Sequence, residues 1–487
     1  MPARYPRDLA PAAKACNDRQ VRLVVLVLLA GCRLGFDELR TAPDAPGDAA
    51  PVACPQHPCS APGIYRSVGP GNVSALVRST PLAPNTLVIA GTTATFSTPL
   101  PDQVGLGDVI EYDSDGDDNV DALAFITERV SSTEYFVAAE LGGPPAAGTS
   151  TRWAMFRAYT SLASAMIGET NPAVAKAFDG WGIAPHDVAA LGVPWHVACY
   201  ADAIDNRIVR LDNWITSATA FVRIFTPRES YEVGISQRHA GRWSDAAYSL
   251  QPPSTTIDLA ISIGDAFARI EGLQIFVDSD DSPGDLPYAI DLHGTAAFEF
   301  HVSESILRGN NTPTPNTSIQ RGIKVDASNS ARQTLYAYNN VIYDLGGGLD
   351  VRGIESTGNG STIYSYNNTF VNLHPAILGN DPSDIAIIRN TLAIACASPC
   401  LGGVGTISGS NNVGFEFDDY AIGVAPASDA IADYFVGGDD FHLGAGPGAG
   451  ELVDRGADLS ADPELPFAHD IDRAPRTAAW DIGADER

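Results

Sequence analysis

The chain has 487 residues, of which 59 are acidic and 30 are basic, so its formal net charge is −29. A charge of this sign and size repels the phosphates of nucleic acids and the anionic surfaces of membranes, and nucleic-acid binding is therefore set aside. The length is sufficient for two or three domains, because domains usually hold about 100–200 residues.

The N-terminus has a short apolar run that ends in a cysteine. Five basic residues precede the run Leu23 to Ala30, which is too short to span a bilayer and stops at Gly31-Cys32. The motif "LLAGC" resembles the lipobox of bacterial lipoproteins. The resemblance implies a signal peptide over residues 1–32 and a lipid on Cys32, and the arginine that follows implies the outer membrane. The alternative is a chance apolar stretch that ends in cysteine.

Three segments follow before the long repetitive part of the chain. Residues 33–62 are rich in proline and alanine and lack apolar periodicity, which is typical of a linker. Residues 63–157 contain short alternating runs separated by Gly, Pro and Asp, which predict a small β domain. The patterns "FRAYTSLASAMIG" and "DVAALGV" predict a helical connector over residues 158–194, and we expect it to cap the β region that follows.

The rest of the chain repeats itself. The segment "TLYAYNNVIYDL" begins at Thr334, and its near copy "TIYSYNNTFVNL" begins 28 residues later. Two degenerate copies upstream place Ser305 and Gly272 at the aligned position. In the four clear copies the aligned position is asparagine, at Asn340, Asn368, Asn390 and Asn412. Units of about 20–30 residues with short strands and no helix predict a solenoid.

The repeated asparagine has a physical reason. The corner between two strands of one coil needs a residue at positive φ, which asparagine and glycine tolerate best. Stacked coils then place one side-chain amide about 4.8 Å above the next, so that each can donate to its neighbour. We therefore predict that the four asparagines form a ladder along one corner.

The asparagine corners, the entry "RIEGLQI" and the closing "DIDRAPRTAAWDIGADE" resemble right-handed parallel β-helix repeat proteins of the pectate-lyase-like superfamily. The resemblance covers residues 195–487. It implies an all-β fold, with a right-handed parallel β-helix behind a small N-terminal β domain and a short capping helix. Lyases, glycosidases, esterases and adhesins share this fold, so the function has to be argued from the site.

A second set of strands lies between the corners, in "YAIDLHG", "RGIKVDAS" and "GGLDVRGI". Alternation points their aliphatic side chains inward and leaves two outward columns, which contain Asp291, Lys324, Asp350 and His293, Asp326, Arg352. The resemblance implies that sugar polymers bind on this kind of sheet face. The candidate catalytic residues are Asp291, Lys324, Asp326, Asp350 and Arg352.

Two chemistries fit this charged patch. Asp291 and Asp350, two rungs or roughly 9–10 Å apart, are near the upper limit for an inverting pair of carboxylates. Alternatively, Lys324 or Arg352 abstracts the proton alpha to a uronate carboxyl group, as the lyase resemblance implies. The competing interpretation is a cross-strand ladder of ion pairs that only braces an exposed sheet.

The segment "DSDGDDNVD" is the candidate metal site. It places oxygen donors at alternate positions, the spacing by which a tight loop surrounds calcium, at Asp113, Asp115, Asp117, Asn119 and Asp121. The pattern departs from the EF-hand, since glycine is fourth instead of sixth and Ala124 replaces the bidentate glutamate. A solvated hairpin turn is the alternative.

The cysteines indicate the compartment. Cys54 with Cys59, and Cys396 with Cys400, are close pairs that suit local disulfides in an oxidising space. Cys199 lies in "WHVACYAD", which predicts a buried strand, and we expect it to be a core thiol.

Together these features predict a monomeric, lipid-anchored protein of the bacterial cell envelope that engages polysaccharide. If the protein degrades the polysaccharide, the expected reaction is that of a lyase or a glycoside hydrolase. The alternative is a non-catalytic surface adhesin or a structural envelope protein.

Replacement of Cys32 by alanine tests the anchor. Because the thiol is the site of lipid attachment, the Cys32→Ala precursor should partition into the aqueous phase of a detergent extraction, whereas the wild type partitions into the detergent. A variant that remains in the detergent phase would contradict the lipobox.

Overall fold

The computed structural model describes residues 57–180, 186–253, 259–264, 266–278, 287–310, 320–327, 332–346, 350–358, 360–396, 400–403, 405–477 and 479–487. The predicted signal peptide, Cys32 and most of the linker lie outside the described residues. Within the described part, no helix combines the length and the apolar character needed to cross a membrane.

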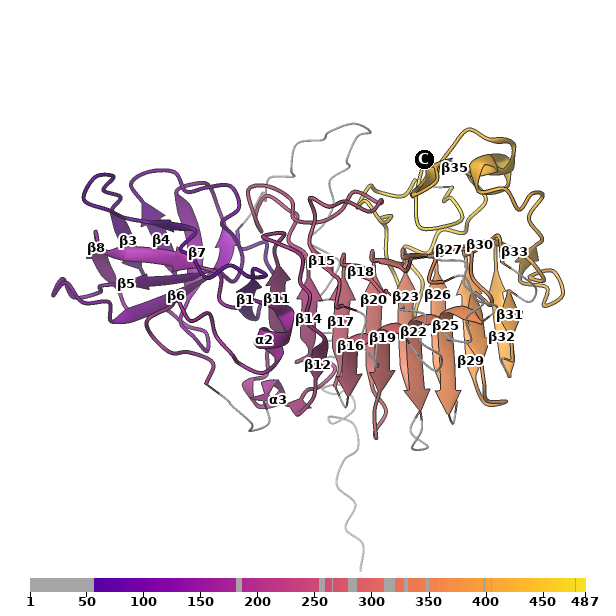
Figure 1. Ribbon diagram of the computed structural model, residues 1–487, viewed down its shortest axis with the longest axis horizontal. Coiled ribbons are helices and arrows are strands. Elements are labelled where there is room, and N and C mark those ends of the chain that lie inside the picture. The colour runs from indigo at the N-terminus through magenta and orange to yellow at the C-terminus, as the bar shows by residue number, and fades with distance from the viewer. Residues whose placement is uncertain are drawn as a thin grey trace, which may run out of the picture. The chain divides into compact units, whose positions relative to one another are not determined.

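Three parallel sheets form a solenoid in which each full coil adds one strand to each sheet (Figure 1). The first sheet contains, in spatial order, β1 (Ile64–Val68), β11 (Trp195–Cys199), β14 (Val222–Phe225), β17 (Ala268–Glu271), β20 (Glu299–Ser303), β23 (Thr334–Tyr338), β26 (Thr362–Tyr366), β29 (Ile385–Arg389) and β32 (Thr406–Ser410). The second contains β15 (Ser249–Leu250), β18 (Gln274–Phe276), β21 (Ile306–Arg308), β24 (Val341–Tyr343), β27 (Thr369–Val371), β30 (Leu392–Ile394), β33 (Asn412–Gly414) and β34 (Gly423–Val424). The third contains β12 (Val209–Leu211), β16 (Leu259–Gly264), β19 (Tyr288–His293), β22 (Gln320–Ala327), β25 (Val351–Gly358), β28 (Ile377–Gly379) and β31 (Leu401–Gly402). The all-β parallel solenoid predicted from the repeat is confirmed.

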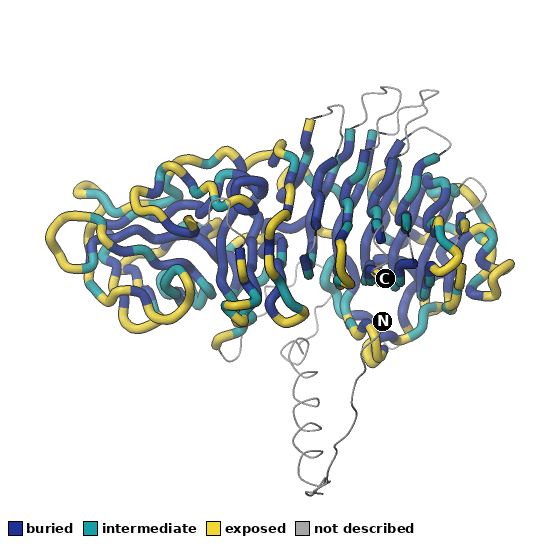
Figure 2. Tube along the Cα trace, turned by 90° about the horizontal axis from the view of Figure 1, so that it is seen from below, coloured by how far each residue is buried: buried dark blue, intermediate teal, exposed yellow. Residues whose placement is uncertain are grey.

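The solenoid interior is one continuous hydrophobic core (Figure 2). Alternation along each strand builds it, as in β23, where Leu335 and Ala337 are buried and their neighbours are partly exposed. Ile323 and Val325 of β22 fill it from the third sheet, as alternation predicts. Each such aliphatic side chain contributes about 1.5–3 kcal/mol when it is fully buried.

A separate antiparallel β domain is inserted into the first coil. Its sheet contains, in spatial order, β2 (Val77–Arg78), β9 (Trp153–Phe156), β5 (Val109–Tyr112), β6 (Ala122–Arg129), β7 (Glu134–Ala138), β4 (Thr93–Phe96), β3 (Leu87–Ala90) and β8 (Gly148–Ser150), and it has its own core. The prediction of one β domain over residues 63–157 is wrong at its start. Strand β1 pairs in parallel with β11, with Ile64 opposite Trp195, and so it belongs to the solenoid. Pairing between strands so distant in sequence leaves no local pattern that reveals it.

Short helices follow the inserted domain. In α2 (Leu162–Met166) the side chain of the N-cap Ser161 accepts from Ser164 N, and α3 (Val188–Leu191) ends at Gly192 with φ of 70°. Helix α2 adds Leu162 and Met166 to the solenoid core. The remaining elements are β10 (His186–Asp187), β13 (Trp214–Ile215), η1 (Ile431–Asp433), β35 (Phe435–Gly437), β36 (Asp440–Leu443) and η2 (Pro447–Glu451).

At the corner between the first and second sheets, each coil contributes two consecutive residues with different roles. The first residue of each pair has positive φ: 53° at Asn339, 49° at Asn367, 50° at Asn390 and 57° at Asn411. Upstream coils place Glu304 at 50° and Gly272 at 72° in the same position. The residue that follows points its side chain into the corner and contacts the next coil.

This inward row forms the predicted ladder of buried side-chain amides. Asn340 Nδ2 donates to Asn368 Oδ1 at 3.0 Å, and the Asn340 backbone N–H donates to the same oxygen at 3.0 Å. Asn340 Oδ1 accepts from Ser305 N at 3.0 Å on the other side. Asn368 Nδ2 donates to Ala337 O at 2.8 Å, so both of its polar groups are used.

Asn390 is not a member of this inward row, which corrects the predicted alignment. Arg389 lies opposite Tyr366 in the sheet, so Asn390 matches Asn367 and the next residue, Thr391, matches Asn368. Thr391 N donates to Asn412 Oδ1 at 2.8 Å and keeps the row continuous. With one asparagine in this coil, the amide takes the positive-φ position, because a β-branched threonine is strongly disfavoured there.

The positive-φ asparagines form an outer row that binds the C-terminal segment. Asn339 Nδ2 donates to His469 O at 2.6 Å, and Asn367 Nδ2 donates to Asp481 O and Gly483 O at 3.1 Å each. The Asn390 amide both donates to Ala457 O and accepts from Ala457 N, at 2.8 Å in each case. The closing part of the chain is therefore held along the same corner that stacks the coils.

The variant Asn368→Ala tests the inward row. It removes the acceptor of the Asn340 backbone N–H, one of the two acceptors of Asn340 Nδ2 and the side-chain donor to Ala337 O in a buried corner, so the free energy of unfolding should fall by about 1–3 kcal/mol in denaturant titration. Asn411→Gly is the matched control, since its side-chain bond to Arg455 O is exposed and glycine accepts its positive φ; it should change stability by less than about 0.5 kcal/mol. Equal effects of the two changes would contradict the ladder.

Candidate functional site

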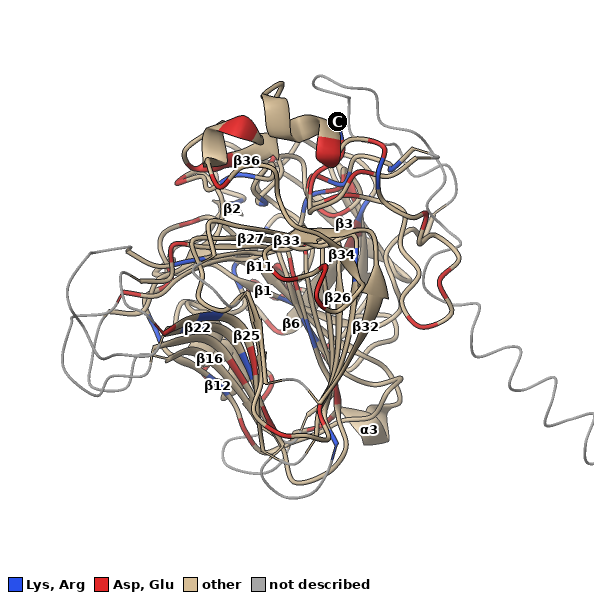
Figure 3. Cartoon of the chain, turned by 90° about the vertical axis from the view of Figure 1, so that its right-hand side faces the viewer, with Lys and Arg blue, Asp and Glu red and all other residues tan. Residues whose placement is uncertain are grey.

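Charged residues gather on β19, β22 and β25 of the third sheet, and Figure 3 shows blue and red segments on β22 and β25. The pairing places Asp291 opposite Lys324, and Lys324 opposite Glu355. A neighbouring column places His293 opposite Asp326. We call this surface the third-sheet face and define it by Tyr288, Asp291, His293, Arg321, Lys324, Asp326, Asp350, Arg352 and Glu355.

Lys324 is at the centre of the third-sheet face. Its Nζ lies 3.3 Å from Asp291 Oδ1 and 3.1 Å from Asp326 Oδ2, and its side chain is 16% exposed. Burial alone would lower the pKa of Lys324, but the charge of Asp291 and the hydrogen bond to Asp326 outweigh burial and raise it. The amine therefore stays protonated at neutral pH, which is unfavourable for a general base.

Sequence reasoning missed three residues of this face, Tyr288, Arg321 and Glu355, of which Glu355 is the most buried. Its side chain is 1% exposed and forms ion pairs with Arg321 and Arg352. Asn380 Nδ2 also donates to Glu355 Oε1 at 2.7 Å. A buried carboxylate surrounded by donors in this way fixes the two arginines more than it offers a free acid or base.

The predicted positions of Asp350 and Arg352 are wrong by register. Arg352 lies opposite Arg321, and Asp350 precedes β25, where its carboxylate accepts from Arg352 Nε and Nη2 at 2.6 and 2.9 Å. Alternation alone fixes which face a residue lies on but leaves the register between coils open.

One sequence signal does give the correct register. The tripeptide Arg-Gly-Ile occurs at residues 321–323 and again at 352–354. Its glycines are required where the coils stack, because a Cβ at Gly322 would lie 2.6 Å from Gly353 O. Alignment on this tripeptide would have placed Glu355 beside Lys324.

The geometry of the third-sheet face bears on both chemistries considered from the sequence. Asp291 and Asp350 do not share a column, so the stacking expected to place them two rungs apart is wrong. Asp291 and Asp326 are brought together, but one protonated Lys324 contacts both. The ionic groups are paired with each other, as the ion-pair ladder predicts, and several remain partly open to solvent, with Asp350 42% exposed.

The candidate calcium loop joins β5 to β6. Asp113, Asp115 and Asp117 converge, with one oxygen of each within 4.8 Å of the others. Both Asp113 oxygens accept backbone N–H groups, from Gly116 and Asp118. Asp121 instead accepts from Ser114, and Asn119 Nδ2 donates to Asp117. Hydrogen bonding, chiefly from Asn119, lowers the pKa of Asp117.

The cysteines follow the predictions in part. Cys59 is disulfide-bonded, and its predicted partner Cys54 lies outside the described residues. Cys396 and Cys400 are free thiols that contact each other, which corrects the second predicted disulfide. Cys199 is fully buried, and burial raises the pKa of its thiol, as expected for a core residue.

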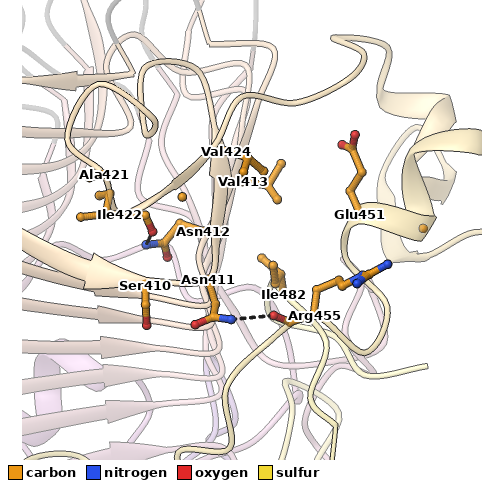
Figure 4. A pocket seen from close by; sticks show the side chains of 12 residues that line it. Ser410, Asn411, Asn412, Val413, Ala421, Ile422, Val424, Glu451, Arg455 and Ile482 are labelled. Carbon is orange, nitrogen blue, oxygen red and sulfur yellow. Dashed lines mark hydrogen bonds between the residues drawn. The ribbon is translucent and has the colours of Figure 1, made fainter.

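A pocket of about 500 Å³ lies at the last coil, between β33, β34 and residues 450–455 (Figure 4). Apolar side chains such as Val413, Ile422 and Ile482 line it. Its charged residues do not converge on a common point, since Glu451 accepts from Ala427 N and Tyr434 Oη instead. The pocket therefore lacks the converging polar groups of an active site.

The structure also assembles a histidine and aspartate cluster that sequence reasoning did not single out. His442 on β36 meets Asp472 and Asp485 of the C-terminal segment. The hydrogen bond to Asp472 raises the pKa of His442 to about 10, and burial raises the pKa of Asp485 to about 6. No spacing signal exists, because 30 and 43 residues separate these aspartates from the histidine.

Comparison with known proteins leaves the family open. The sequence matches no protein-family model, and no curated protein matches it significantly.

The variant Glu355→Gln tests how the third-sheet face is held. It leaves two arginines without their buried counter-charge, so the free energy of unfolding should fall by about 3–5 kcal/mol. Asp350→Asn removes an exposed partner of Arg352 and should cost about 0–1 kcal/mol. Urea titration of both variants measures the difference. A loss below about 1 kcal/mol for Glu355→Gln would show that this carboxylate does not organise the face.

Proposed function

We propose that the protein binds a neutral polysaccharide along the third-sheet face, without cleaving it. The observation on which the proposal rests is the row of partly exposed polar side chains around Lys324, backed by the buried Glu355. Each coil of the solenoid adds one rung about 4.8 Å further along, which produces an extended surface suited to a repeating ligand.

The chemistry of the face suits hydroxyl groups. Asp291, Asp326 and Asp350 offer acceptors, Lys324 and Arg352 offer donors, and these groups alternate in space. Tyr288 adds a ring that lies 5.3 Å from Lys324 Nζ. The charges of the face nearly cancel, and the chain as a whole has a net charge of −29, so a neutral polymer is favoured over a polyanion.

Binding is favoured over catalysis for two reasons. Proton abstraction from a uronate needs a neutral base, whereas the pKa of Lys324 is raised by Asp291 and Asp326 against the effect of burial. Hydrolysis needs one carboxyl group that donates a proton, whereas Asp291 and Asp326 are both engaged by the same ammonium group.

We also propose that a lipid on Cys32 holds the protein at the bacterial outer membrane. The "LLAGC" motif and the Pro- and Ala-rich residues 33–62 support the anchor and a tether. The disulfide at Cys59 supports an oxidising compartment.

Calcium is proposed as a ligand of the β5–β6 loop alone. The convergent oxygens of Asp113, Asp115 and Asp117 are the hard donors that calcium prefers. Asp121 accepts from Ser114 and Asn119 donates to Asp117, so the convergent set contains three of the five predicted ligands. Calcium bound there would brace the hairpin of the inserted domain, and it has no part in the proposed binding of polysaccharide.

Affinity gel electrophoresis in soluble polysaccharides tests the proposal. At least one neutral polymer should retard the wild-type protein, and Lys324→Ala with Arg352→Ala should weaken the retardation about tenfold or more. Arg207→Ala is the matched control, since this arginine is exposed and its ion pair lies elsewhere. A chelator should leave the retardation unchanged.

Reducing-end and unsaturated-product assays on the same polymers distinguish binding from cleavage. Release of new ends that depends on Asp291 or Asp326 would show a hydrolase and overturn the non-catalytic proposal. Absence of retardation by every polymer, or equal retardation of wild type and double variant, would remove the third-sheet face as the binding surface.

A further inference from the structure

The histidine and aspartate cluster joins two segments that are separate in sequence. β36 supplies Asp440 and His442, and the C-terminal segment supplies Asp472 and Asp485. One ligand atom each of His442, Asp472 and Asp485 lies within 4.8 Å of the others, and His442 Nε2 is 2.8 Å from Asp472 Oδ2. Small side-chain rotations would allow these atoms to share one ion with bonds of about 2.0–2.2 Å.

One oxygen of the cluster is buried and unsatisfied. Asp472 Oδ1 receives no hydrogen bond from any described residue. The backbone at Gly241 packs against this oxygen and provides no side chain that could donate to it. A Cβ at Gly241 would lie 2.3 Å from Asp472 Oδ1 and 2.7 Å from His442 Nε2. A buried carboxylate oxygen without a donor is costly, and such atoms are satisfied by ions or ordered water.

A second unsatisfied side chain lies in the same loop, two residues before Gly241. His239 is 3% exposed, and neither of its ring nitrogens makes a well-formed hydrogen bond within the described residues. Burial and the positive charge of Arg238 lower the pKa of His239, against the opposing effects of the Asp472 charge and of a weak hydrogen bond to the Glu304 backbone. The Asp472 oxygen is therefore the unsatisfied group of the cluster that a bound cation would satisfy.

The other nitrogen of His442 is already positioned as it is in metal-binding histidines. Its Nδ1 is bonded to Asp440 Oδ1. Metal-ligating histidines usually donate their second N–H to a carboxylate, which orients the ring and increases the basicity of the ligating nitrogen. In this arrangement His442 Nε2 faces Asp472 Oδ2. The ion would bind to Nε2 and replace the proton of the hydrogen bond between these two atoms.

We propose that His442, Asp472 and Asp485 bind a divalent transition-metal ion, for which zinc is the closest match. Imidazole nitrogen and carboxylate oxygen are both zinc ligands, and three protein ligands leave room for water in the fourth position. The ion links the β35–β36 hairpin to the C-terminal segment, which the outer asparagine row holds against the solenoid. Its role is structural, and it is independent of the third-sheet face.

Zinc binding to the mature full-length chain tests the proposal. Protein freed of metal by a chelator is titrated with zinc chloride and desalted, and the bound zinc is measured by atomic emission. The wild type should retain one equivalent at this cluster, and zinc should raise its melting temperature. Asp472→Asn and His442→Gln should weaken that binding at least about tenfold.

Two matched variants locate the ion. Asp439→Asn changes an exposed aspartate beside the cluster and should leave zinc binding as in the wild type. Asp113→Asn disables the β5–β6 loop and should also leave the equivalent in place. The proposal is overturned if the metal-free wild type shows neither bound zinc nor a rise in melting temperature, a result that needs no variant to fold. It is equally overturned if Asp472→Asn and His442→Gln bind zinc as tightly as the wild type.

Discussion

The buried side-chain amides at one corner of the solenoid are the interaction on which the rest of the structure depends. The strands of one coil form backbone hydrogen bonds only with the neighbouring coils. The next coil must therefore place its corner directly over this one and offer matching donors and acceptors. Asn340 and Asn368 achieve this by direct contact, and Thr391 and Asn412 continue it. Because unpaired polar groups in this corner would be costly, the amides favour one register of stacking over all others.

The same corner determines where the C-terminal segment lies, and through it the cluster around His442. The positive-φ asparagines turn their amides outward and donate to backbone oxygens of residues 455–483. The stacking also sets the third-sheet face, since each rung there repeats the spacing fixed at the corner. The arrangement of the third-sheet face and the position of the C-terminal segment are thus two consequences of one backbone constraint.

Much of the fold could be predicted because its pattern is local. Strand alternation, the repeated dodecamer and the need for asparagine at positive φ are all visible in a short window of sequence. The predicted alignment is wrong at Asn390, because this coil has one asparagine for two corner positions, the positive-φ residue and the inward residue after it. Only the requirement for positive φ shows that Asn390 occupies the first of these positions. The sequence places β1 in the wrong domain, because its partner β11 lies beyond a whole inserted domain.

The site was harder to predict than the fold. Alternation correctly placed Asp291, Lys324 and Asp326 on one face, but the register of β25 depends on coil stacking, which brings Glu355 to Lys324 instead of Asp350. The cluster around His442 depends on how the C-terminal segment closes, and no spacing in the sequence indicates that closure.

Hydrogen exchange of backbone amides in the native protein tests the central claim most directly. The N–H groups of Ser305, Asn340 and Thr391 donate to side chains of the next coil, so they should exchange as slowly as the buried strands on either side. The exposed hairpin amide of Asn119 gives the fast reference. If the three corner amides exchange as fast as this hairpin while the strands remain protected, side-chain stacking at the corner does not hold the coils together.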